Sequence, residues 1–85
     1  MEKNLNNIKI NSKLKRVEIN LAKEIYSVEM VKCAVEDFKG VCKGSLKEGD
    51  NIFVLLELDD KEGLKKIGYE FCNYVLGLMK NEALV

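Results

Sequence analysis

Residues 52–58 constrain the fold of this chain more than any other segment. Their sequence, Ile-Phe-Val-Leu-Leu-Glu-Leu, is apolar at both odd and even positions, so a strand here presents apolar side chains on both of its faces. The run is far shorter than the roughly 20 apolar residues that a membrane-spanning helix needs. It therefore predicts the central strand of a sheet, within one domain, because a chain of 85 residues has room for a single core.

A strand and a helix precede this segment. Residues 16–21 alternate apolar and polar side chains, which is typical of a half-buried strand. Ser27 is a suitable N-cap for a following helix, in which apolar residues recur at intervals of three and four. We expect this helix to end at Gly40, in a left-handed conformation.

A second helix follows the apolar strand. We expect Asp59 or Asp60 to cap it, and helical spacing of apolar residues continues to about residue 81. Gly68 and Gly77 each cost about 1 kcal/mol relative to alanine inside a helix. We therefore expect both glycines to allow another element to approach closely.

Residues 41–47 should form a hairpin with the apolar strand. The two segments flank the turn-forming sequence Glu-Gly-Asp-Asn at 48–51, which predicts a turn with positive φ angles. Lys43 and Lys47 are typical of an edge strand, which is protected by charge from pairing with other chains.

The order of elements predicts a small two-layer α+β sandwich of the β-α-β-β-α type. A right-handed crossover places the apolar strand between the other two, which gives a three-stranded sheet of order 1-3-2 with both helices on one face. Residues 1–13 are polar and rich in Asn, so we expect a flexible N-terminal arm and a single domain over 14–85.

The helices would leave the other face of the sheet without cover. That face carries either Phe53 and Leu55 or Val54 and Leu56, because neighbouring side chains of a strand point to opposite sides. A contiguous apolar patch of this kind on a small protein usually marks an interface.

Charge and residue composition narrow the function. The 14 basic and 14 acidic residues balance, which argues against nucleic acid as a partner. The chain contains no His, the commonest general base and nitrogen ligand of metals. Cys33, Cys42 and Cys72 lack CxxC spacing, so we expect free thiols in a reducing cytoplasm. We accordingly predict a cytoplasmic protein that is not an enzyme, with no membrane contact, no cofactor, no metal site and no catalytic residue.

Several short motifs resemble those of one family. They are Val-Glu-Ile-Asn-Leu at 17–21, Ile-Tyr-Ser at 25–27, Ala34, Phe-Val-Leu at 53–55, and Phe-Cys-Asn-Tyr-Val-Leu at 71–76. From about residue 17 to 79 the chain resembles HxsD, the His-Xaa-Ser system protein. Members of that family look like small accessory proteins of radical S-adenosylmethionine (SAM) enzymes that modify ribosomally made peptides. The resemblance implies a helper role here, with the radical SAM enzyme or its precursor peptide as the partner.

Three hypotheses for function remain open. The first is a noncatalytic accessory protein that binds a peptide or a maturation enzyme, with the sheet edge beside 17–21 as the docking site. The second is a homodimeric structural module with no role in peptide maturation. A reactive cysteine, or a metal held by Asp59 and Asp60, ranks last. The residues expected to contact a partner are Val17, Ile19, Tyr26, Phe53, Leu55, Tyr69 and Tyr74.

Overall fold

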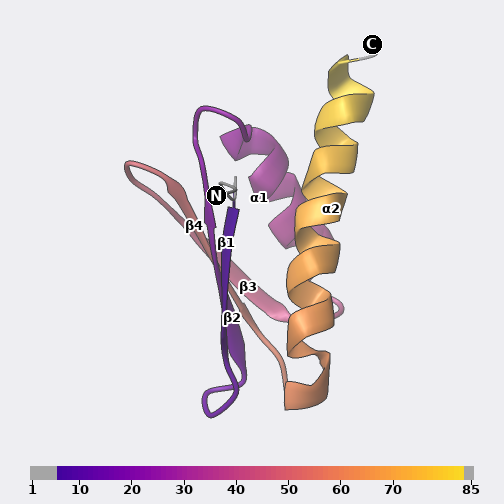
Figure 1. Cartoon of the computed structure of the whole chain (residues 1–85). Coiled ribbons are helices and arrows are strands. Elements are labelled where there is room, and N and C mark those ends of the chain that lie inside the picture. Colours follow the sequence, from indigo (N-terminus) through magenta and orange to yellow (C-terminus); the bar gives the residue numbers. More distant parts are fainter. Residues whose placement is uncertain (1–5, 84–85) are drawn as a thin grey trace, which may run out of the picture.

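A computed structural model describes residues 6–83, which form a sheet layer and a helix layer (Figure 1). The strands are β1 (Asn6–Asn11), β2 (Arg16–Leu21), β3 (Lys43–Glu48) and β4 (Ile52–Glu57). The helices are α1 (Val28–Asp37) and α2 (Leu64–Ala83), and a short 3-10 turn, η1 (Lys61–Gly63), precedes α2. The predicted α+β sandwich, with both helices on one face of the sheet, is confirmed.

The sheet has four strands in the order β1-β2-β4-β3, and all neighbours are antiparallel. The apolar strand β4 lies between β2 and β3, as its sequence predicts, and the lysine-bearing strand β3 forms one edge. The predicted number of three strands is wrong, because a further strand pairs with β2 on its other side.

That additional strand, β1, comes from the predicted N-terminal arm. The side-chain oxygen of Asn11 accepts a hydrogen bond of 3.1 Å from the N–H of Leu14, and Lys15 adopts a left-handed φ of 54°. Together they turn the chain back, so that Ile8 lies opposite Ile19 in the ladder. Residues 6–11 are therefore an edge strand and not part of a flexible arm, whereas residues 1–5 lie outside the described range.

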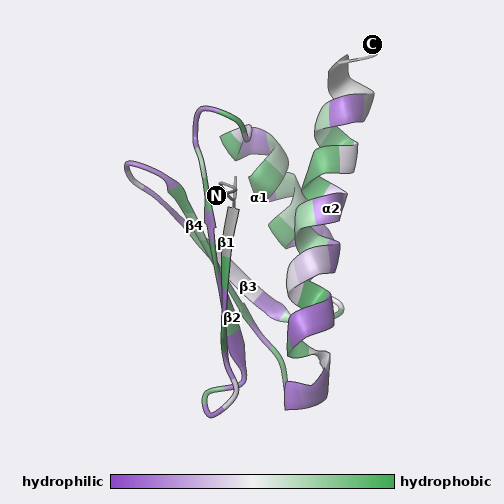
Figure 2. Cartoon of the chain, viewed as in Figure 1, coloured by the Kyte–Doolittle hydropathy of each residue, from purple (hydrophilic) through white to green (hydrophobic). Residues whose placement is uncertain are grey.

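The core lies between the sheet and the helices. The inward side chains of β2 and β4 are all buried, and Figure 2 shows hydrophobic residues gathering where α1 and α2 face the sheet. Phe71 of α2 is fully buried, and its ring packs edge-on against that of Phe38, with centroids 5.2 Å apart. The strand residues of this core are Val17, Ile19, Leu21, Ile52, Val54 and Leu56.

The caps that the sequence predicts lie near the helix starts, whereas the predicted glycine cap at the end of α1 does not form. The Ser27 hydroxyl accepts a hydrogen bond of 3.3 Å from the N–H of Met30. Asp60, which was predicted to cap the second helix, caps instead the η1 turn that leads into it. No glycine in the described range has a positive φ, so the predicted left-handed end at Gly40 and the positive φ angles in the turn at 48–51 are wrong. At the end of α1, the N–H of Cys42 donates to the carbonyl of Phe38 instead.

The two helical glycines have different surroundings. A Cβ atom on Gly68 would lie 3.1 Å from Cγ2 of Ile8 and 3.2 Å from Cγ1 of Val17. Gly68 therefore allows α2 to pack closely on β1 and β2, as predicted. A Cβ atom on Gly77 would meet nothing within 4 Å. No described element therefore approaches Gly77 closely, and the prediction for that position is wrong. Over the same range, neither helix is long and apolar enough to cross a membrane.

Candidate protein-binding surface

The sheet face that points away from the helices is not covered by any described element (Figure 1). Side chains alternate between the two faces of each strand, so the residues between the buried positions belong to this surface. We call it the open face. It consists of Lys9, Asn11, Arg16, Glu18, Asn20, Lys43, Ser45, Lys47, Phe53, Leu55 and Glu57.

Two apolar side chains lie in the middle of the open face. Phe53 is 46% exposed and Leu55 is half-buried, and both line a hollow of about 420 Å³. Of the two pairs that the sequence left open, Phe53 and Leu55 are outside, whereas Val54 and Leu56 are in the core. The apolar area is nevertheless smaller than the predicted contiguous patch, because the neighbouring strands contribute polar and charged side chains to this face.

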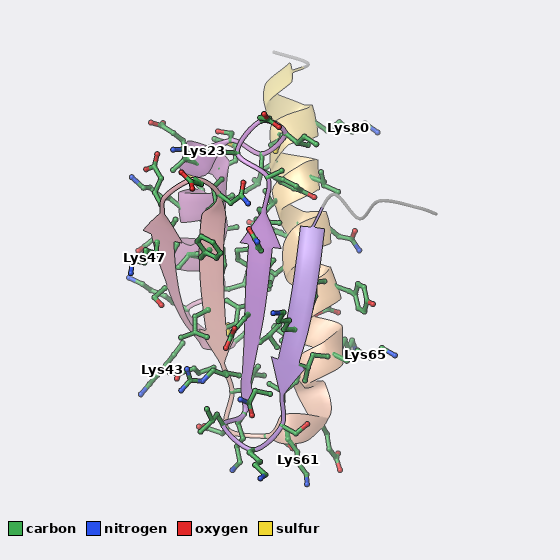
Figure 3. The ribbon with its side chains drawn as sticks, turned by 60° about the vertical axis from the view of Figure 1, so that its left-hand side comes forward. Lys23, Lys43, Lys47, Lys61, Lys65 and Lys80 are labelled. Carbon is green, nitrogen blue, oxygen red and sulfur yellow. The ribbon has the colours of Figure 1, made fainter. Side chains whose placement is uncertain are left out.

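Basic residues outnumber acidic residues on the open face. Lys9, Arg16, Lys43 and Lys47 compare with two carboxylates, Glu18 and Glu57. Arg16 and Glu57 approach to 4.0 Å, and an exposed pair at that distance contributes at most about 1 kcal/mol. No described acidic group forms an ion pair with the three lysines. Figure 3 shows Lys43 and Lys47 extending from β3 at one edge of the sheet.

The open face also contains two polar atoms that are covered and have no hydrogen-bond partner among the described residues. They are Nε of Arg16 and Oδ1 of Asn20, and both side chains line the hollow. A covered polar atom without a partner costs about 1–3 kcal/mol. Because both atoms are covered, a partner could reach them only if the side chains around them moved.

Three of the residues predicted to contact a partner are in the core instead. Val17 is 0%, Ile19 1% and Tyr26 4% exposed. Val17 and Ile19 are on the side of β2 that faces the helices. Tyr26 follows β2 in a turn, where its N–H donates a hydrogen bond to the carbonyl of Ala22. The predicted docking edge beside 17–21 is also occupied, since β1 pairs along it. These positions offer no surface to a partner, so the predicted edge docking at β2 is wrong.

The predicted tyrosines lie in the helix layer, away from Phe53 and Leu55. Tyr69 is 54% and Tyr74 38% exposed, and both are on α2. The Tyr74 hydroxyl donates a hydrogen bond to the carboxylate of Asp37, and its ring packs edge-on against Phe38 with centroids 5.4 Å apart. Tyr74 therefore connects α2 to α1, and the structure does not bring it together with the open face.

The bond between Tyr74 and Asp37 predicts a loss of stability at alkaline pH. The hydrogen bond to the Asp37 carboxylate raises the pKa of Tyr74 above its ordinary value, and desolvation of the hydroxyl adds a smaller contribution in the same direction. A raised pKa in the folded state stabilises the protein below the unfolded value of about 10, and this stabilisation is lost as the pH rises through the folded pKa. We expect Tyr74→Phe to be less stable than wild type at about pH 8, with a smaller difference at about pH 10.5. Urea denaturation at the two pH values measures this, and a constant difference would contradict the linkage.

The cysteines have different exposures. Cys33 is exposed, whereas Cys42 and Cys72 are buried, and burial raises the pKa of the Cys42 thiol. Because the thiolate is the reactive form, we expect one thiol to be labelled rapidly in the native protein and the other two to be labelled only after denaturation. Labelling with an aromatic disulfide reagent measures this, with Cys33→Ser as the control that should lack the fast phase. Three equally fast thiols in the native protein would contradict the burial pattern.

Comparisons with known proteins gave no match to a family model, to a curated protein or to a solved structure. Within the described range, no group of three or more Cys, Asp or Glu side chains is placed to hold a metal ion.

The basic residues of the open face were not among the predicted contact residues. The sequence did contain a signal for them: along each strand they alternate with the side chains that are buried, which places them on the opposite face of the sheet.

Proposed function

We propose that this chain is a noncatalytic accessory protein that binds a protein or peptide partner on the open face. The observation that carries the proposal is Phe53, which is 46% exposed on the interior strand β4 and lines the hollow with Leu55. An exposed aromatic residue inside a polar rim is typical of the anchor positions of protein interfaces. The resemblance to HxsD supports a radical SAM enzyme or its precursor peptide as the partner.

A homodimer that buries the open face is the alternative. A stable interface buries about 1,200–2,000 Å² in total, and obligate dimers bury a largely apolar surface. The open face has only Phe53 and Leu55 as apolar side chains among nine polar or charged residues. Facing copies would also bring two surfaces with surplus positive charge together, which is unfavourable. These observations favour a different partner over a second copy.

Affinity capture of the tagged chain from its native lysate, with identification by mass spectrometry, tests the proposal. We expect wild type to retain a radical SAM enzyme or a short precursor peptide, and Phe53→Ala to lose it. Tyr69→Ala is the matched control, because Tyr69 is an aromatic residue of comparable exposure, 54% against 46% for Phe53, but lies on α2. Retention of the same partner by Phe53→Ala would contradict binding on the open face, and recovery of self-associated chain alone would favour the dimer.

A further inference from the structure

The charges of the open face specify the chemistry of its partner. All four basic side chains lie around the apolar centre: Lys9 on β1, Arg16 on β2, and Lys43 and Lys47 on β3. Phe53 and Leu55 on β4 lie between these strands. The surface is therefore apolar at its centre and positively charged at both edges of the sheet, although the chain as a whole has no net charge.

The spacing of the basic residues is similar in two directions. Lys9 of β1 lies in the same ladder row as Ser45 of β3, three strand intervals or about 14 Å away, so Lys43 and Lys47 on either side of Ser45 are each about 16 Å from Lys9. Lys43 and Lys47 are four residues apart on β3, or about 13 Å. In an extended peptide, side chains at positions i and i+4 lie on one side and are also about 13 Å apart, with the side chain at i+2 between them.

We infer that the open face binds an extended acidic peptide segment with the pattern acid-x-apolar-x-acid; this rests on the proposed function and names the chemistry of its partner. The apolar side chain contacts Phe53 and Leu55, and the two carboxylates reach basic side chains at the rim.

Other occupants fit the open face less well. Single-stranded nucleic acid stacks its bases on several aromatic side chains, and the open face has only Phe53. Glu18 and Glu57 lie among the basic residues and would repel a continuous run of phosphates. A peptide with two spaced carboxylates avoids that repulsion, because its intervening side chains are uncharged.

Three labelled peptides test this inference by fluorescence anisotropy on the full chain. They contain Glu-Thr-Leu-Thr-Glu, Gln-Thr-Leu-Thr-Gln or Lys-Thr-Leu-Thr-Lys between identical neutral ends. At low salt we expect the acidic peptide to bind about tenfold more tightly than the basic peptide, with the neutral peptide between them. Added salt should reduce the difference, because exposed charges are screened.

Charge reversal on the protein supplies the matched control. We expect Lys43→Glu combined with Lys47→Glu to reverse the preference between the acidic and basic peptides. Lys65→Glu combined with Lys80→Glu should leave it unchanged, because those two lysines extend from the α2 side (Figure 3). All four positions are exposed, and circular dichroism verifies that both variants remain folded.

The possible outcomes bear differently on the charge preference and on the proposed function. Equal affinity for the three peptides would overturn the charge preference and leave peptide binding on the open face intact. Binding of none of them, or tighter binding of a uridine oligonucleotide than of the acidic peptide, would also overturn the inference. A wild-type dimer in sedimentation that dissociates in Phe53→Lys would show that a second copy occupies the face, and would overturn both.

Discussion

Phe71→Ala should destabilise the protein by about 3–5 kcal/mol, the usual cost of removing a buried Phe side chain. Phe71 is 0% exposed, and its ring contacts that of Phe38 between α2 and α1. A domain of this length has a total stability of about 4–13 kcal/mol. The substitution therefore removes a large part of it, and urea denaturation followed by circular dichroism measures the change.

Tyr69→Ala is the control for this effect. Tyr69 is on the same helix but is 54% exposed, so we expect its loss to change stability by no more than about 0.5 kcal/mol. Similar losses from the two substitutions would show that α2 packs through a different face, and would contradict the core described above.

Ile19→Asp should prevent stable folding. Ile19 lies at the centre of the buried face of β2 and is 1% exposed. A carboxylate there would lose its hydration without an ion-pair partner, at a cost of several kcal/mol in addition to the lost apolar packing. That sum is comparable to the whole stability of the domain, so we expect no cooperative thermal unfolding transition by circular dichroism.

Glu18→Asp tests the same strand on its other side. Glu18 is exposed on the open face, and this change should leave the protein folded with nearly the stability of wild type. A folded Ile19→Asp with normal stability would mean that β2 has the opposite register, because a shift by one residue exchanges the two faces of a strand.

Sequence patterns predicted the elements whose apolar periodicity is strong. The alternation at Val17, Ile19 and Leu21 identified the buried face of β2, and the continuous apolar run identified β4 as a central strand. Strand β1 was missed because Asn is unfavourable in strands and only Ile8 and Ile10 alternate there. Its pairing depends on distant residues, since Gly68 of α2 leaves the space that Ile8 occupies.

The candidate surface was predicted only in part. Alternation along β4 identified Phe53 and Leu55 as one possible outward pair, but it did not decide which pair faces the helices. Tyr26 was predicted to contact a partner, whereas the structure buries it. The basic residues come onto one surface only when β1, β2 and β3 are assembled around β4 in one sheet, and no local pattern contains that arrangement.

Nuclear magnetic resonance mapping locates the peptide-binding surface on the chain. The isotope-labelled chain is titrated with the peptide that contains Glu-Thr-Leu-Thr-Glu, and backbone and methyl shifts are followed. We expect the largest changes at Glu18, Phe53 and Leu55 on the open face, with little change along the exposed side of α2. Changes confined to Tyr69, Leu76 and their neighbours on α2 would contradict binding on the open face, because they would place the binding surface on the helix layer.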